Sequence, residues 1–211
     1  MAVTNLHIVD HPVVQHMLAE AREAHTPPTR FRALLRTLGS LLAYEALRQT
    51  PQRTRRVMTP LQAMDSREIA SPITVVPILR AGLGMAEGVL DLWPEAKVGH
   101  LGLFRNEATL EPVSYYERLP AAVSAGPVLL IDPMLATGGS ACEAIRRLRS
   151  KGCTDLRFVC LVAAPPGVSR VNEMDATIPI YTASLDTQLN EHGYIVPGLG
   201  DAGDRLYGTG D

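Results

Sequence analysis

The stretch Val128-Leu129-Leu130-Ile131-Asp132-Pro133-Met134-Leu135-Ala136-Thr137-Gly138-Gly139-Ser140 decides the fold of this chain. Its first four residues are apolar and partly β-branched, which predicts a buried strand that ends before Asp132. Thr137-Gly138-Gly139-Ser140 follows the aspartate and offers backbone N–H groups with little side-chain bulk. A helix should come next, because apolar side chains recur on one helical face at Ala141, Ala144, Ile145 and Leu148.

Strand, acid, glycine loop and helix N-terminus together make a site for an anion. Glycines let the backbone approach a phosphate, and the first turn of a helix supplies unpaired N–H groups and the positive end of its dipole. The Asp132 carboxylate adds a group that accepts a hydrogen bond from a hydroxyl or binds a metal ion. We therefore expect residues 132–140 to hold the 5-phosphate and ribose of a phosphorylated sugar. The alternative is an ordinary glycine-rich turn before a helix.

Composition limits the other possibilities. A length of 211 residues suits one domain with a full core, and 46% apolar and 20% charged residues are usual for a globular protein. The formal net charge of −2 argues against general affinity for nucleic acid or an anionic membrane. No signal peptide is evident at the N-terminus, and no apolar run approaches the length of a membrane helix.

The cysteines indicate a reducing compartment. Cys142, Cys153 and Cys160 are odd in number and form no CxxC pair. We expect three reduced thiols in a cytoplasmic protein, with neither a disulfide nor a zinc site.

Two helices precede the sheet. The first is expected within residues 11–24, and the second from a cap at Thr29 to about Arg48, with an apolar stripe from Phe31 to Leu42. Residues 51–71 are polar and arginine-rich, with short β segments at best, and their arginines are interpreted as a solvated face. We treat residues 1–70 as an N-terminal extension of the core.

Strands and helices then alternate, which predicts an α/β fold with a parallel, helix-covered sheet. Pro179 in the last strand suggests that this strand lies at an edge. Residues 185–211 are rich in Gly, Pro and Asp and are expected to form an irregular hood over the core, residues 71–184. The expected strands are 73–79, 98–104, 128–131, 156–163 and 178–183, with one hairpin arm at 113–117. Helices are expected at 82–92 and 166–174, besides the one that follows Ser140.

Ligands of such sheets bind at the carboxyl ends of the strands, so three further segments become candidates. Arg80 with Gly82 and Gly84 suggests a loop around a diphosphate, and a plain turn with a surface arginine is the equal alternative. Residues 104–112 form a polar loop that would carry Arg105 over a bound phosphate, unless it is an ordinary exposed loop. The last segment, residues 190–204, has glycines and prolines that let its backbone face a small planar ligand, and taken alone it is equally consistent with a structured C-terminal cover. His192 there is interpreted as structural.

Taken together, these segments resemble the uracil phosphoribosyltransferase family of type I phosphoribosyltransferases. The resemblance covers essentially the whole chain. It rests on residues 76–85, 105–107, 132–140 and 190–203, with 40–45 in the second helix.

The resemblance implies transfer of a phosphoribosyl group from 5-phosphoribosyl 1-diphosphate (PRPP) to uracil, giving UMP in pyrimidine salvage. By matching position, Arg80 and Arg105 contact PRPP, residues 132–140 hold its ribose 5-phosphate, and Asp201 faces it. The implied uracil site is Ile195, Gly200, Asp201 and Ala202. The implied catalytic residues are Arg80, Arg105, Asp132 and Asp201, and no residue is predicted as a general base for uracil N1.

The resemblance also bears on metal and partners. Many related enzymes carry a second acid where this chain has Pro133, so Mg²⁺ is expected mainly on the diphosphate rather than in a protein cage. A GTP effector, known for some members, and a homo-oligomer are further expectations.

The residues of the C-terminal segment give an independent argument about which base is bound. An orotate carboxylate needs a cation and a purine site often has a lysine, yet no Lys or Arg lies between Val171 and Asp204. A neutral base read by backbone groups therefore fits, and only Arg205 weakens this reasoning. The remaining alternatives are a phosphoribosyltransferase for another base and an RNA-binding regulator with this fold, which the acidic net charge disfavours.

Overall fold

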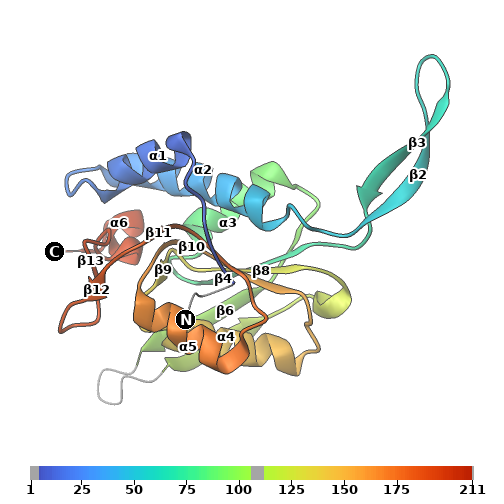
Figure 1. The fold of residues 1–211 in the computed structure, drawn as a ribbon. Helices are drawn as coiled ribbons and strands as arrows, with labels where there is room; N and C mark the ends of the chain where they lie inside the picture. The colour runs from blue at the N-terminus through green and yellow to red at the C-terminus, as the bar shows by residue number, and fades with distance from the viewer. Residues whose placement is uncertain (1–4, 106–111, 211) are drawn as a thin grey trace.

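The computed structural model describes residues 5–105 and 112–210, and it is built around one mostly parallel sheet (Figure 1). The strand order is β1-β11-β10-β8-β4-β6-β7, and within it only the β6–β7 pairing is antiparallel. The short β5 (Lys97–Val98) pairs with β4, and β9 (Met134–Leu135) pairs with β10. The bounds of the main strands are β1 Leu6–Ile8, β4 Thr74–Leu79, β6 His100–Arg105, β7 Pro112–Arg118, β8 Val128–Ile131, β10 Leu156–Ala163 and β11 Ile180–Leu185.

Helices cover both faces of this sheet. α1 (Pro12–Arg22), α2 (Pro28–Ala46) and α3 (Leu83–Leu92) lie on one face, and α4 (Gly139–Ser150) and α5 (Pro165–Asp175) lie on the other (Figure 1). β10 shows why the sheet needs both layers: all of its residues are buried, and they alternate between the two faces. Val159 and Leu161 join the core under α2, whereas Phe158 and Cys160 join the core under α4. A single 3-10 turn, η1 (Val123–Ala125), precedes β8.

The predicted core elements are present within a few residues of their expected bounds. The expected strand 98–104 is divided into β5 and β6, with Gly99 between them. The α/β class with a mostly parallel sheet is confirmed. No helix in the described parts of the chain is both long and apolar enough to span a membrane.

Two local predictions are wrong. Thr29 does not cap α2, because the helix already begins at Pro28, whose fixed φ suits a first helical position. The strand that follows Pro179 is not an edge strand, because β1 pairs with the outer side of β11. Pro179 lies just before β11, so its missing N–H removes no hydrogen bond from the strand itself. Its carbonyl still accepts the N–H of Phe158 at 2.9 Å.

The polar stretch after α2 forms a long β-hairpin that projects from the body (Figure 1). β2 (Gln52–Met58) and β3 (Ala63–Ile69) pair antiparallel over their full lengths, which exceeds the short β segments expected. Its arginines form exposed pairs with local acids, for example Arg53 with Glu68 at 2.7 Å and Arg56 with Asp65 at 3.1 Å. These pairs fit the interpretation of this stretch as a solvated face.

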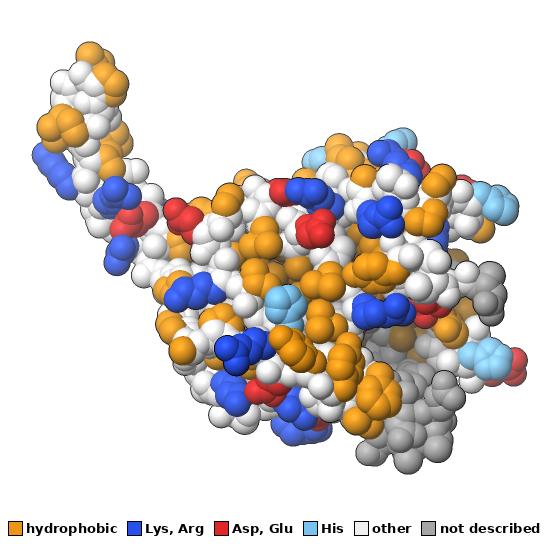
Figure 2. All heavy atoms as spheres, turned by 180° about the vertical axis from the view of Figure 1, so that it is seen from behind, with side chains coloured by type: hydrophobic (Ala, Val, Ile, Leu, Met, Phe, Trp, Pro, Cys, Tyr) orange, Lys and Arg blue, Asp and Glu red, His pale blue; other side chains and the backbone are white. Residues whose placement is uncertain are grey.

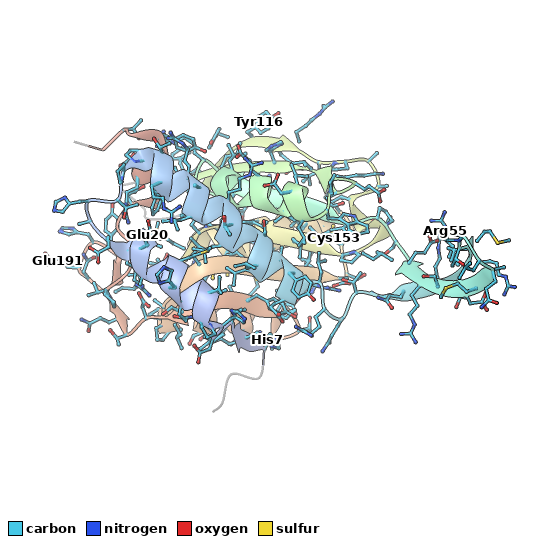
Figure 3. The ribbon with its side chains drawn as sticks, turned by 90° about the horizontal axis from the view of Figure 1, so that it is seen from above. His7, Glu20, Arg55, Tyr116, Cys153 and Glu191 are labelled. Carbon is cyan, nitrogen blue, oxygen red and sulfur yellow. The ribbon has the colours of Figure 1, made fainter. Side chains whose placement is uncertain are left out.

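The C-terminal residues form the hood. It contains the small hairpin of β12 (Gln188–Leu189) and β13 (Ile195–Val196), followed by α6 (Ala202–Tyr207). Glu191 of the hood and Arg55 of the projecting hairpin lie at opposite ends of the molecule (Figure 3). The hood therefore covers one end of the sheet only.

Candidate active site

The loop after β8 lies at the carboxyl edge of the sheet, beside the loop after β4. β4 and β8 are neighbouring parallel strands, so Arg80 and Asp132 leave the sheet at the same edge. The loop after β8 is anchored on β10: the Pro133 carbonyl accepts the N–H of Leu161 at 2.9 Å, and Met134 and Leu135 pair with β10 as β9. Its backbone is therefore held by the centre of the sheet.

This loop encloses a small cavity of about 90 Å³ at the start of α4. Gly138 has a φ of +78°, a left-handed conformation that favours glycine, and α4 begins at the next residue. Gly167 of α5 packs directly behind the loop, where an added Cβ would lie 2.6 Å from the Ala136 carbonyl oxygen. The first turn of a helix points unpaired N–H groups outward, so this cavity suits an anion such as a phosphate. Its lining is Asp132, Met134, Leu135, Ala136, Thr137, Gly138, Gly139, Ser140 and Ala141.

Asp132 and Asp201 bring two carboxyl groups to this site. Burial raises the pKa of Asp132 to about 7, the Met134 N–H at 3.5 Å opposes this shift, and the charge of Asp201 raises the pKa further. Asp201 caps α6 by accepting the N–H of Asp204 at 3.0 Å. The two acids therefore interact although 69 residues separate them in the sequence.

Arg80 extends from the loop after β4 toward α6. Its side chain is 56% exposed, and one guanidinium nitrogen lies 3.6 Å from the Asp204 carboxylate. The guanidinium carbon lies 5.6 Å from the centre of the Tyr207 ring, and the Tyr207 hydroxyl donates to the Arg80 carbonyl at 3.1 Å. The peptide bond between Leu79 and Arg80 is cis.

The hood loop combines buried side chains with glycines in the left-handed conformation. Ile195 is buried in the core under α2, so its side chain is packed into the protein. Gly198 and Gly200 have φ values of +61° and +73°, and a Cβ on Gly198 would lie 2.1 Å from the Ile195 carbonyl oxygen. Ala202 is also fully buried. Glycines at such positions allow backbone N–H and C=O groups to approach a ligand without intervening side chains.

Residues from the N-terminal helices hold this loop, and sequence reasoning missed them. Arg22 donates to both carboxylate oxygens of Asp186 at 2.6 and 2.7 Å and to the Gly198 carbonyl at 2.6 Å. Asp186 also accepts the Gly198 N–H at 2.8 Å and the Ser184 hydroxyl at 2.7 Å. Burial alone would raise the pKa of Asp186, but these hydrogen bonds outweigh it and the pKa is lowered. No local pattern links Arg22 to residues so far along the chain.

Arg205, the residue that weakened the argument about the base, is engaged elsewhere. Its guanidinium donates to the carbonyls of Ala21 and Leu199 at 2.7 Å and of Glu23 at 2.6 Å. It also stacks 4.2 Å from the centre of the Phe31 ring. Arg205 is the only Lys or Arg after Arg170 in the sequence, so the hood has no other such cation for a ligand carboxylate.

The other sequence-predicted residues are placed differently. β6 ends at Arg105 on the far side of β4, which brings its backbone to the same sheet edge. Asn106 and Glu107, which carry the family resemblance together with Arg105, lie outside the described residues, and so does most of the loop predicted to close over a bound phosphate. His192 is exposed in the hood, 3.5 Å from Glu191.

In the described part of the chain, neither a metal cluster nor the hollow beside β1 offers an alternative place for the predicted site residues. Within residues 5–105 and 112–210, no three His, Cys, Asp or Glu side chains gather as a metal site would require. A larger hollow of about 520 Å³ lies beside β1 and α2 and contains none of the predicted site residues. The anion cavity, Arg80 and the hood are therefore the features that share one location.

Comparison with known proteins matches nearly the whole chain to one protein family. The family model described as uracil phosphoribosyltransferase matches residues 8–209. A uracil phosphoribosyltransferase of Bacillus velezensis is 51% identical over 205 residues, which cover 97% of this chain and 98% of that protein. One from Dictyoglomus thermophilum is 49% identical over 207 residues, covering 96% and 98%.

Solved structures agree with the fold. The structure of a protein from Aquifex aeolicus has a TM-score of 0.92 at 40% identity and covers 96% of this chain and 97% of its own. An adenine phosphoribosyltransferase from Leishmania donovani has a TM-score of 0.59 at 12% identity, covering 88% and 86%, which shows likeness of fold alone.

Proposed function

Because this chain belongs to the uracil phosphoribosyltransferase family, we propose that it transfers the 5-phosphoribosyl group of PRPP to uracil. The products are UMP and diphosphate, which makes the reaction a step of pyrimidine salvage. The observation that carries this proposal is the meeting of the anion cavity, Arg80 and a hood without a free Lys or Arg at one sheet edge.

We assign the ligand groups to residues as follows. The backbone of residues 132–140 binds the 5-phosphate at the start of α4, and Asp132 accepts ribose hydroxyls. Arg80 and Arg105 bind the diphosphate, since Arg80 follows β4, Arg105 is the last residue of β6, and both strands end at this edge. Uracil lies against the hood backbone at Ile195, Gly200 and Ala202, with Asp201 between the base and the sugar.

The chemistry follows from these positions. Uracil N1 forms the new bond to the anomeric carbon as the bond from that carbon to diphosphate breaks, and the N1 proton is released. Arg80 and Arg105 stabilise the negative charge on the departing diphosphate. Holding nucleophile and sugar together removes much of the entropic cost of their encounter. Water is excluded where the hood covers the sheet edge.

Magnesium fits the site as a companion of the substrate. Asp132 and Asp201 are two carboxyl groups that interact, fewer than the oxygen ligands a divalent ion takes from a protein cage. Bound with PRPP, Mg²⁺ would neutralise charge on the diphosphate. We therefore propose that Mg²⁺ is held mainly by the diphosphate, near these two acids.

A radiochemical assay tests the function. Purified protein with labelled uracil, PRPP and Mg²⁺ should form UMP, and orotate and hypoxanthine should each be poor substrates because the hood lacks a free Lys or Arg. Arg80→Ala should abolish most of the activity, whereas Arg36→Ala, which removes an exposed pair with Asp91 between α2 and α3, should leave it unchanged. Equal turnover of orotate or hypoxanthine would contradict the proposed base, and RNA binding without UMP formation would favour a regulator.

The partners of the enzyme are also proposed. The apolar stripe of α2 is buried in its own protomer, so α2 offers no such stripe to a partner. Figure 2 shows hydrophobic side chains on the surface of the projecting hairpin. Met58 is 77% exposed there, Leu61 94% and Met64 46%. Such side chains favour contact with a second copy, and we propose a homo-oligomer that uses the hairpin. We further propose that the protein is one domain, with the extension 1–70, core 71–184 and hood 185–211.

Two last proposals concern regulation and location. Activation by GTP is proposed from the family resemblance, and the radiochemical assay tests it by adding GTP at low PRPP. A cytoplasmic location is proposed from the three cysteines, which are free and buried. Burial raises the pKa of the Cys160 thiol to about 12, so this residue is unreactive.

A further inference from the structure

α6 makes three separate contacts with Arg80. The Tyr207 hydroxyl donates to the Arg80 carbonyl at 3.1 Å, the Tyr207 ring lies under the guanidinium with 5.6 Å to the ring centre, and the Asp204 carboxylate lies 3.6 Å from a guanidinium nitrogen. The first contact fixes the backbone of the Arg80 loop, and the other two hold its side chain. The same short helix is capped at its N-terminus by Asp201, which belongs to the proposed base site.

α6 is itself firmly supported. Leu206 is 1% exposed, and it packs so closely on α3 that a Cβ on Gly84 would lie 2.8 Å from one of its methyl groups. Arg32 of α2 donates to the Leu206 carbonyl at 2.7 Å. The helix therefore gives Arg80 a fixed support.

Asp204 differs from Tyr207 because it binds the part of Arg80 that a diphosphate would bind. Its carboxylate accepts the Thr209 hydroxyl at 2.6 Å, so its position does not depend on Arg80. The pair with Arg80 is long and half-exposed, with side-chain exposures of 56% and 39%. Such pairs are weak, and a ligand with several negative charges displaces them easily.

We propose that Tyr207 is a positioning residue for Arg80 and that Asp204 holds the Arg80 guanidinium until the substrate's diphosphate replaces it. This proposal rests on the proposed function, because it assigns the diphosphate to Arg80. The C-terminal helix thereby connects the hood, which faces the base, with the loop that binds the leaving group.

Two variants separate the two roles. Tyr207→Phe keeps the ring under the guanidinium and removes only the hydrogen bond to the Arg80 carbonyl. Asp204→Asn removes the negative charge and keeps an oxygen for the Thr209 hydroxyl. Tyr44→Phe and Asp91→Asn are the matched controls: Tyr44 also has an arginine over its ring, at 6.0 Å, and Asp91 also pairs with an arginine, and both lie away from the sheet edge.

The measurements are the affinity for diphosphate alone and for PRPP, by titration calorimetry without uracil, and the steady-state constants for both substrates. Tyr207→Phe should weaken PRPP binding and raise its KM by about three- to tenfold, the usual effect of one lost hydrogen bond, with kcat and the KM of uracil within about twofold. Asp204→Asn should tighten diphosphate binding by about two- to fivefold, since a competing exposed charge is gone. The controls should match the parent protein.

Other results overturn the proposal. If Tyr207→Phe equals Tyr44→Phe, Tyr207 does not position Arg80; if it lowers the melting temperature and changes all constants alike, its role is only structural. If Asp204→Asn binds diphosphate no more tightly than Asp91→Asn does, Asp204 does not compete with the ligand. A parent protein that forms no UMP refutes the proposed function instead, and the calorimetric arms distinguish this case because they need no turnover.

Discussion

Replacing Asp132 by asparagine should make the protein more stable and less active. Asn keeps the shape of the side chain and an oxygen for the Met134 N–H, but it carries no charge into the partly buried site. Burial raises the pKa of Asp132 from 3.8 to about 7, so the folded protein holds its proton over a pH range in which the unfolded chain has lost it. Between about pH 4 and 7 the folded state therefore binds more protons than the unfolded state, and the free energy of unfolding falls as pH rises.

The size of the effect follows from the shift. Each pKa unit corresponds to about 1.4 kcal/mol, so the full shift gives an upper bound of about 4 kcal/mol. The side chain of Asp132 remains in partial contact with solvent, which reduces the expected gain to about 1–2 kcal/mol. For a chain of this length that gain raises the melting temperature by about 2–8 °C. The gain should be largest at pH 8 and small near pH 4, where the folded parent protein is protonated at this position and the unfolded chain has lost its proton only in part.

Thermal unfolding of Asp132→Asn and the parent protein at pH 5 and pH 8, at one protein concentration, measures this difference. Asp91→Asn is the control, because it removes a carboxylate from the surface and should show no gain that grows with pH. kcat/KM for PRPP should fall at least about tenfold in Asp132→Asn, because a charged acceptor for the ribose hydroxyls is lost. In the parent protein kcat/KM should decline as the pH drops below about 7. An equal change in stability at pH 5 and pH 8 would refute the reasoning.

Three other changes test other parts of the site. Gly167→Ala places a methyl group 2.6 Å from the Ala136 carbonyl oxygen and should displace the phosphate loop, raising the KM of PRPP at least about tenfold with little change for uracil; a normal KM would contradict the assignment of the phosphate to this loop. Arg105→Ala should slow the chemical step in single-turnover experiments more than it weakens uracil binding, and an unchanged rate would exclude a role in leaving-group stabilisation. Leu61→Ser at the hairpin tip should shift the protein toward smaller species in sedimentation at unchanged melting of the monomeric fold, and an unchanged distribution would exclude the tip as a contact.

Sequence reasoning found the sheet because its signals are local. The apolar run of β8, the aspartate after it and the glycines before α4 are contiguous, so their pattern predicts a strand, a loop and a helix together. Sequence reasoning failed where contacts between segments that are distant in the sequence determine the structure. β1 is only three residues long and forms because it pairs with β11. No sequence pattern near Leu6 indicates this pairing. The length of the β2–β3 hairpin was likewise underestimated, because its strands pair with each other and bury few side chains.

The same distinction holds at the site. Arg80 and Asp132 could be proposed because each follows an apolar strand, and the structure brings them to one edge. The environment of Arg205 was not predictable, because its carbonyl partners at Ala21 and Glu23 precede it by more than 180 residues. Tyr207 was missed for a different reason: its hydroxyl acts on a backbone carbonyl, which gives no sequence signal.

The attachment of the hood by Arg22 and Arg205 has a consequence for redesign. Arg22 binds the main-chain carbonyl of Gly198 and Arg205 that of Leu199, and this loop is the one proposed to bind the base through its own main chain. A pocket of this kind is indifferent to most single side-chain exchanges, because the recognising atoms are common to all amino acids. Apart from a cation introduced into the hood, a change of base preference therefore calls for a change in loop length or in the arginine anchors, so most point substitutions would not open a route to a new substrate.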